Sequence, residues 1–138
     1  MKNKKLNPKR RKPFFNRSSI NSRINSIQNK EVNEILSIYF ICEDTAIKII
    51  EAAYLPEFIS KKFEVKQLKY AMQNLGYSVN NSIDLIFNTN FNNNGLYSVR
   101  HLRNKIIHSA SKSAIKEVIR NRKRYLDSMM EFIDLCCE

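Results

Sequence analysis

Glycine and proline are scarce in this sequence of 138 residues, which contains two glycines and three prolines. A sandwich or barrel of many short strands needs these residues at its frequent tight turns. Their scarcity therefore argues against an all-β fold and favours helices. The chain length suits one domain with a single modest hydrophobic core, because small domains bury a limited fraction of their surface.

Cysteine clusters and long apolar runs are also missing. Cys42 lies in an apolar stretch and Cys136 and Cys137 are adjacent, which matches neither a disulfide framework nor a zinc site. His101 and His108 are seven residues apart, but no clustered carboxylate accompanies them, so we expect no metal and no cofactor. No stretch approaches the ~20 apolar residues of a spanning helix, and no signal-type segment follows the basic N-terminal stretch. We therefore expect a soluble, cytoplasmic protein without a membrane partner.

Acidic residues are absent from residues 1–30, which hold ten of the 24 lysines and arginines. The positive net charge of +11 therefore belongs mainly to this end of the chain. Low hydrophobicity, together with Pro8 and Pro13, predicts that residues 1–17 form a flexible basic arm. Two interpretations of the arm stay open: attraction to RNA, DNA or anionic lipid through counterion release, or a solubilising tail.

Apolar residues with a period near 3.6 occupy most of residues 18–138. The strongest pattern runs from Val32 to Ala53, and Gly76 is placed to cap the end of the helix after it. An Asn-rich loop at residues 88–95 separates the later helices. The pattern predicts an all-α fold, an up-and-down helical bundle of about five or six helices at residues 18–30, 31–54, 61–76, 79–87, 96–109 and 113–137.

The segment LRNKIIHSA, residues 102–110, carries the most informative polar residues. Leu102, Ile106 and Ile107 are expected to anchor it in the core, so that its polar side chains project from a fixed platform. Asn104 precedes His108 by one helical turn, close enough for its amide to orient the imidazole. Arg103 and His108, by contrast, are five residues apart, about 140° around a regular helix. The side chains of Arg103 and His108 therefore do not share one face of the helix.

The arrangement Arg103-Asn104-x-x-x-His108, near the start of the last part of a small helical bundle, resembles the signature of the HEPN superfamily. The resemblance implies a homodimer in which two copies of the motif meet across a two-fold axis and form a metal-independent endoribonuclease site. It implies catalytic roles for Arg103 and His108 and a supporting role for Asn104. A shared site would also accommodate the 140° separation, because each arginine can act beside the partner's histidine. By this resemblance the chain is expected to be a toxin or phage-defence effector, with a possible antitoxin or regulatory partner.

One feature of HEPN toxins that are paired with a minimal nucleotidyltransferase antitoxin is missing. Those toxins carry a tyrosine two residues after the histidine as the target of adenylylation. The corresponding residue in this sequence is Ala110. We therefore do not expect that mode of regulation.

The implied chemistry agrees with the residue types. Metal-free RNA cleavage needs a group that moves a proton between the 2′-hydroxyl and the leaving oxygen, and a fixed cation near the phosphorus. The His108 imidazole suits the first role, since imidazole exchanges protons near neutral pH. The Arg103 guanidinium suits the second, since it can bind two phosphate oxygens at once. The product would carry a 2′,3′-cyclic phosphate.

Several other side chains are candidates for contacts with RNA. Tyr97 and Phe91 can stack on bases, although burial in the bundle is the more usual role of such aromatic residues. Glu43 and Asp44 interrupt an apolar helix, either as acids near the site or as a solvated strip. The basic residues can contact phosphates or simply form a solvated face; they are Arg100, Lys105, Arg120, Lys123 and Arg124.

A second function is compatible with the same sequence. The chain can be a non-enzymatic helical dimer that binds nucleic acid or a protein partner. The arm would then supply the affinity and the bundle the dimer contact. Deletion of the arm would abolish the activity of such a protein, whereas His108→Ala would not.

Overall fold

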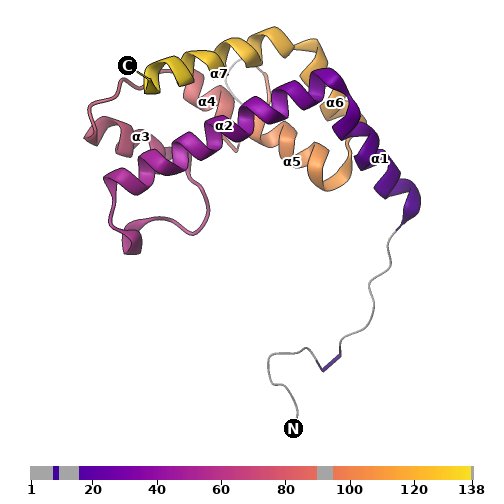
Figure 1. Ribbon diagram of the computed structural model, residues 1–138, viewed down its shortest axis with the longest axis horizontal. Helices are drawn as coiled ribbons and strands as arrows, with labels where there is room; N and C mark the ends of the chain where they lie inside the picture. The colour runs from indigo at the N-terminus through magenta and orange to yellow at the C-terminus, as the bar shows by residue number, and fades with distance from the viewer. Residues whose placement is uncertain (1–7, 10–15, 90–94, 138) are drawn as a thin grey trace.

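The computed structural model describes residues 8–9, 16–89 and 95–137, which form helices and their connecting segments without any strand. The prediction of an all-α helical bundle is therefore confirmed (Figure 1). Most of the predicted arm, Phe91 and the middle of the Asn-rich loop lie outside the described residues. The helices within them are α1 (Arg17–Gln28), α2 (Lys30–Ala53), the 3-10 helix η1 (Pro56–Phe58), α3 (Val65–Asn74), α4 (Ser82–Phe87), α5 (Val99–Ser109), α6 (Lys112–Arg120) and α7 (Arg122–Cys136).

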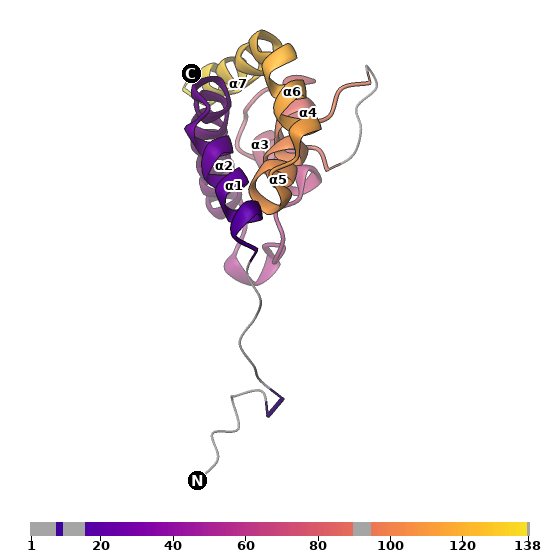
Figure 2. The same cartoon turned by 90° about the vertical axis from the view of Figure 1, so that its right-hand side faces the viewer.

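Helix α2 is the central element of the bundle. Its 24 residues span about 36 Å, with α7 along one side and α5 along the other (Figure 1). In the perpendicular view, α1 and α2 lie opposite α5 and α6 (Figure 2). The Asn29 side chain accepts a hydrogen bond from the Val32 N–H at 3.0 Å and caps the start of α2. The helix ends at Ala53, shortly before Pro56.

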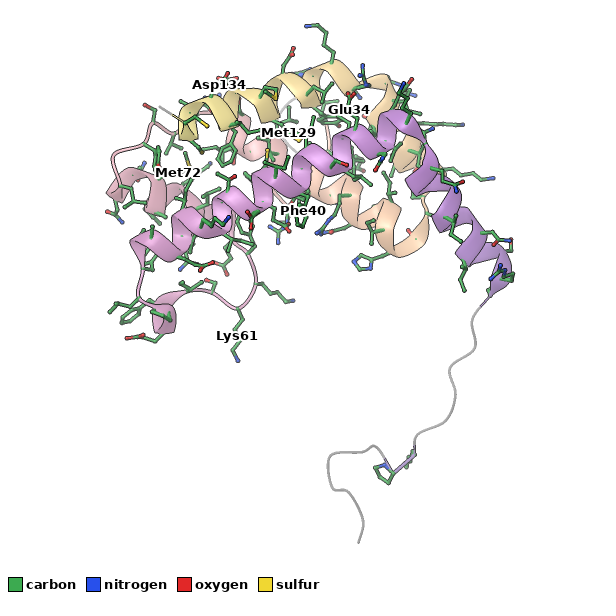
Figure 3. All side chains as sticks on the ribbon, viewed as in Figure 1. Glu34, Phe40, Lys61, Met72, Met129 and Asp134 are labelled. Atoms are coloured by element: carbon green, nitrogen blue, oxygen red, sulfur yellow. The ribbon has the colours of Figure 1, made fainter. Side chains whose placement is uncertain are left out.

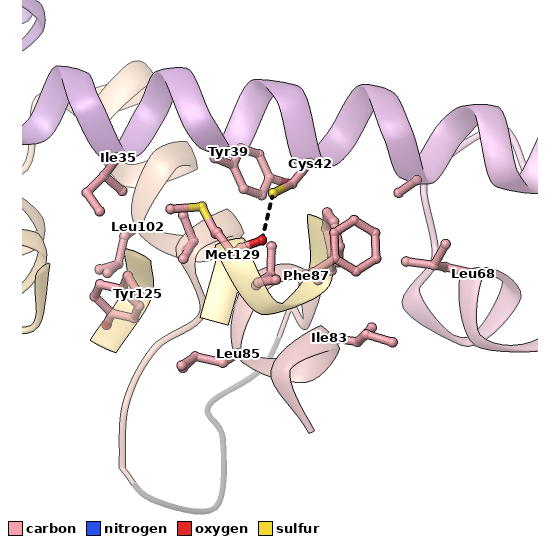
Figure 4. Close-up of a cluster of buried hydrophobic side chains, with 14 of the residues drawn as sticks. Ile35, Tyr39, Cys42, Leu68, Ile83, Leu85, Phe87, Leu102, Tyr125 and Met129 are labelled. Atoms are coloured by element: carbon pink, nitrogen blue, oxygen red, sulfur yellow. Dashed lines mark hydrogen bonds between the residues drawn. The ribbon is translucent and has the colours of Figure 1, made fainter. Parts of the chain in front are cut away.

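The core forms where α2 meets α4 and α7 (Figure 4). The ring of Phe87 lies 5.9 Å from that of Tyr39 and 5.2 Å from that of Phe132, which joins the three helices. The Cys42 thiol donates to the Met129 carbonyl oxygen at 3.9 Å. The buried side chains on α2 follow the predicted helical period, and they are Val32, Ile35, Tyr39, Cys42, Ala46, Ile49 and Ile50.

The predicted final helix at 113–137 is in fact two helices that meet at Asn121. The Asn121 amide donates to the Glu117 carbonyl oxygen at 3.3 Å and to its carboxylate at 3.0 Å. Asparagine competes in this way with the helical hydrogen bonds of the main chain. Asn121 has φ −109° and ψ 21°, so α7 starts in a new direction.

The third helix begins at Val65 rather than at residue 61, because a side chain holds the preceding segment in another conformation. The Gln67 amide oxygen accepts from the Ser60 N–H at 3.0 Å, and its nitrogen donates to the Phe58 carbonyl at 2.8 Å. The far end of α3 agrees with the prediction. Gly76 has φ +88°, a conformation that glycine adopts without strain, so it closes the helix as expected.

Candidate functional site

Helix α5 carries the Arg-Asn-x-x-x-His motif and is fixed at both ends. The buried Ser98 hydroxyl accepts from the His101 N–H at 3.1 Å and donates to the Asn88 carbonyl. At the other end, Ala110 takes the left-handed conformation, and its N–H donates to the Ile106 carbonyl at 2.9 Å. The motif therefore lies on one helix whose first and last turns are both defined.

The apolar residues of the motif are not all buried. Leu102 and Ile106 lie in the core as predicted. The prediction that Ile107 is buried is wrong, since 42% of this residue is exposed. Ile107 follows Ile106 by 100° around the helix, which turns it out of the contact with the core.

Arg103 is held against α2. Its Cζ atom lies 5.5 Å from the centroid of the Tyr39 ring, its Nη2 lies 3.4 Å from Glu43 Oε1, and its Nη1 donates to Asn104 Oδ1 at 2.9 Å. The Arg103 side chain nevertheless keeps 34% of its surface exposed. The result is a positioned cation that a ligand in solvent can reach.

Tyr39 fixes the Glu43 carboxylate by donating its hydroxyl to Oε2 at 3.0 Å. Burial, followed by the negative charge of Glu43, raises the pKa of Tyr39 well above its ordinary value. The hydroxyl therefore stays protonated and keeps donating over the whole physiological range. Tyr39 in turn positions the carboxylate that faces Arg103.

Glu43 was one of two acids for which the sequence left two roles open. The structure places it beside Arg103, whereas Asp44 pairs with Lys48 at 2.9 Å on the exposed side of α2. The spacing of the two acids from the buried Tyr39 is the feature of the sequence that distinguishes Glu43 from Asp44. Four residues bring Glu43 back to the edge of the buried face, and five carry Asp44 away from it.

His108 lies in the last turn of α5 and is exposed. It is about 7.5 Å along the axis and about 140° around it from Arg103, so within one chain the two side chains face different directions. Asn104, predicted to orient His108, uses its side-chain oxygen for Arg103. The structure therefore brings together Arg103 and Asn104 but does not bring His108 to the same face.

Apolar side chains are exposed next to Arg103. Phe40 is 67% exposed and precedes Glu43 by three residues on α2 (Figure 3), while Ile107 follows Arg103 by one turn on α5. Large exposed apolar groups beside a positioned charge are typical of an interaction surface. Phe40 and Ile107 thus border the candidate site on both of its helices.

The five basic residues predicted to bind RNA lie in three different places. Arg100 points into the fold, where it donates to the Phe63 carbonyl at 2.9 Å and to the Phe87 carbonyl at 3.3 Å. Lys105 lies on the side of α5 that faces α6. The remaining three gather around a surface hollow of about 360 Å³ at the junction of α6 and α7, and they are Arg120, Lys123 and Arg124.

Neighbouring acids partly neutralise this corner. Arg120 lies 3.5 Å from Glu117, and Lys123 lies 3.1 Å from Asp127. Each pair lies within one helix and includes a largely exposed basic side chain, although Glu117 itself is only 22% exposed, so each pair is weak and can exchange for a competing anion. The corner can therefore bind phosphate without a change of fold.

No group of three or more metal-ligating side chains occurs in the part of the chain that the structure describes. None of the described helices is both long and apolar enough to cross a membrane. No protein-family model matches this chain, and no curated protein or solved structure is significantly similar to it. The resemblance to the HEPN superfamily therefore depends on Arg103, Asn104 and His108 alone.

Proposed function

We propose that this protein is a metal-independent endoribonuclease of HEPN type that acts as a homodimer. The observation that carries the proposal is the position of Arg103, a partly exposed guanidinium held by Tyr39, Glu43 and Asn104 on the same capped helix as an exposed His108. A fixed cation and a proton-transfer group are the two parts that metal-free RNA cleavage needs.

His108 transfers the protons of the reaction, and Arg103 stabilises the charge on the phosphate. The neutral imidazole of His108 removes the proton of the 2′-hydroxyl, and the 2′-oxygen attacks the adjacent phosphorus. The bond from phosphorus to the 5′-oxygen breaks, and the protonated imidazole of the other copy supplies a proton to that oxygen. The Arg103 guanidinium stabilises the added negative charge on the phosphate oxygens. The products are a 2′,3′-cyclic phosphate and a 5′-hydroxyl.

A second copy of the chain would place its own His108 beside the phosphate that Arg103 binds. Within one chain the 140° separation keeps His108 away from the phosphate that Arg103 would bind. Phe40 and Ile107 supply exposed apolar surface next to Arg103, and burial of such surface favours association of two copies. Phe40→Asp should therefore yield monomers in sedimentation experiments and abolish cleavage together with the dimer.

The test of catalysis compares the wild type with His108→Ala on mixed cellular RNA in EDTA, followed by analysis of the fragment ends. We expect cyclic phosphates with the wild type and intact RNA with the variant. Ser109→Ala is the matched control, because Ser109 is exposed on the same helical turn. Cleavage that persists in His108→Ala, or that appears only with added Mg²⁺, would contradict the proposal.

The proposed cellular role is that of a toxin or phage-defence effector, restrained by an antitoxin or another regulatory partner. Induced expression of the wild type should then stop colony formation. Expression of His108→Ala should leave growth intact, since the toxicity is assigned to RNA cleavage. Equal growth arrest by the wild type and by His108→Ala would show that the toxicity does not depend on His108.

One observation favours the alternative, a non-enzymatic protein that binds nucleic acid. Arg120, Lys123 and Arg124 form a basic corner at the junction of α6 and α7, and binding of phosphates at this corner needs no catalytic group. RNA binding that weakens steeply with salt, without cleavage by any form of the protein, would support that function.

A further inference from the structure

A second hollow lies between α5 and α6, on the other side of α5 from Glu43. Its volume is about 230 Å³. Two of its walls are the rings of Tyr97 and His101, which are stacked with centroids 4.4 Å apart and planes 13° from parallel. The polar side chains that line it are Lys105, Ser111, Ser113 and Glu117.

The stacked rings form an aromatic platform. Single-stranded nucleic acids bind such platforms because every base has a flat π-face that stacks on an aromatic ring. Burial, and then the nearby positive charge of Lys105, lowers the pKa of His101. The imidazole is therefore neutral at physiological pH, which suits stacking on a neutral base.

Hydrogen-bonding groups surround this platform. The Ser111 hydroxyl caps α6 by accepting from the Ala114 N–H at 3.2 Å, and it lies 3.1 Å from the Ser113 hydroxyl. The serine pair uses one of its two hydroxyl hydrogens, which leaves the other for a ligand acceptor. The Glu117 carboxylate accepts hydrogen bonds from N–H groups, and it accepts one from the Asn121 side-chain amide at 3.0 Å. The hollow thus offers a donor and an acceptor to the edge of a base.

The hollow is aligned with His108. His101, Lys105 and His108 are spaced by four and three residues, so they share one face of α5. His108 lies about 10 Å along the helix axis from His101. Lys105 lies between His101 and His108 along α5, so its ammonium group can reach the phosphate that links neighbouring nucleotides.

We propose that this hollow binds one nucleotide of single-stranded RNA, with its base stacked on the Tyr97–His101 pair and its phosphate on Lys105. As a substrate subsite, it rests on the nuclease function proposed above. Ser113 and Glu117 would contact the edge of the base, and the strand would continue along the same helix face to His108. The hollow therefore selects for unpaired bases, because a base within a duplex cannot enter it.

The experiment uses the full chain and a fluorescein-labelled, 2′-O-methylated RNA 12-mer, which lacks the attacking hydroxyl and cannot be cleaved. Fluorescence anisotropy gives Kd for the wild type and for Tyr97→Ala. We expect Kd to rise about tenfold in the variant and to be retained in Tyr97→Phe, since stacking needs the ring and not the hydroxyl. Tyr70→Ala is the matched control, because Tyr70 is an exposed tyrosine on α3.

Two further measurements identify the interaction. An abasic oligomer of the same length should bind the wild type and Tyr97→Ala equally, because it has phosphates but no bases to stack. Lys105→Gln replaces an exposed side chain, so folding is preserved, and it should lower the slope of log Kd against log salt by about 0.7. An unchanged Kd in Tyr97→Ala, an equal loss with the abasic oligomer, or an unchanged salt slope in Lys105→Gln would overturn the proposal.

The outcomes for the hollow and for the nuclease are distinct. Cleavage that depends on His108, with no effect of Tyr97→Ala on Kd, would refute the hollow as a subsite and leave the nuclease. Binding that depends on Tyr97, with no cleavage by the wild type, would support the hollow and refute the nuclease. Circular dichroism checks the fold of Tyr97→Ala, which keeps the main-chain carbonyl that accepts from Tyr125 at 3.0 Å.

Discussion

Replacement of Glu43 by glutamine should have opposite effects on stability and on RNA binding. The amide has nearly the shape of the carboxylate and still accepts a hydrogen bond from the Tyr39 hydroxyl. It removes the negative charge beside Arg103, however. Stability should fall because an ion pair is lost, whereas affinity for RNA should rise because phosphate no longer competes with Glu43 for the guanidinium.

The distance and exposure of the pair set the size of the effect. At the observed 3.4 Å, and with an effective dielectric constant of about 20, the Coulomb attraction is about 5 kcal/mol. The side chains of Arg103 and Glu43 are 34% and 21% exposed, so solvent screening and desolvation offset most of this attraction. We expect a net loss of about 1 kcal/mol in the free energy of unfolding, or roughly 3–5 °C in Tm.

A double-mutant cycle isolates the interaction. Glu43→Gln, Arg103→Gln and the double variant are unfolded in urea at low salt and at 1 M salt. The coupling energy should be about 1 kcal/mol at low salt and close to zero at 1 M, where the Debye length is about 3 Å. Asp44→Asn is the control, since its pair with Lys48 is exposed and contributes little.

The same variants then report on the site. Anisotropy with the 2′-O-methylated RNA should show severalfold tighter binding for Glu43→Gln and weaker binding for Arg103→Gln. A coupling energy of zero at low salt would show that the Glu43–Arg103 pair does not form in solution. Weaker RNA binding by Glu43→Gln would refute the role of Arg103 as the phosphate contact.

Three further predictions concern the fold. Phe87→Ala should lower the free energy of unfolding by about 3–5 kcal/mol in urea titrations, because Phe87 is fully buried among three aromatic rings. Ala110→Gly should raise it by about 1 kcal/mol, since glycine adopts the left-handed conformation at φ 49° without strain; a decrease would contradict this reason. Burial raises the pKa of Cys42 to about 12, so at pH 8 a thiol reagent should modify exposed Cys137 quickly and Cys42 only in urea. Because the Cys42 thiol ionises more readily in the unfolded chain, its contribution to stability should be complete below about pH 9 and disappear as pH rises toward 12.

The fold was predictable wherever one helix face is apolar over several turns. The residues from Val32 to Ala53 specify α2 through their period alone, and Gly76 marks the end of α3 through its conformational freedom. The break at Asn121 was not predictable in the same way, because Val118 and Tyr125 continue a helical period across it. The break depends on the side-chain bonds between Asn121 and Glu117, which compete with a continuous helix.

The candidate site was predictable only along a single helix. Arg103, Asn104 and His108 lie on one element, so their spacing gives their directions. The contacts of Arg103 with Tyr39 and Glu43 join α5 to a helix about 60 residues earlier, and tertiary packing alone creates such contacts. Tyr97 precedes the Ser98 cap of α5, so its stacking on His101 depends on the turn that leads into the helix, and the hollow beside the two rings requires α6.

The packing of α7 on α2 has a consequence for synthesis on the ribosome. The ribosome synthesises the apolar face of α2 long before it synthesises α7, the helix that covers this face with Tyr125, Met129 and Phe132. At about 5–20 residues per second, roughly 80 residues of elongation leave this apolar face uncovered for several seconds. The nascent chain is therefore a natural client for a chaperone that binds apolar helices. The finished bundle, with Arg103 locked in place, can form only after α7 has left the exit tunnel.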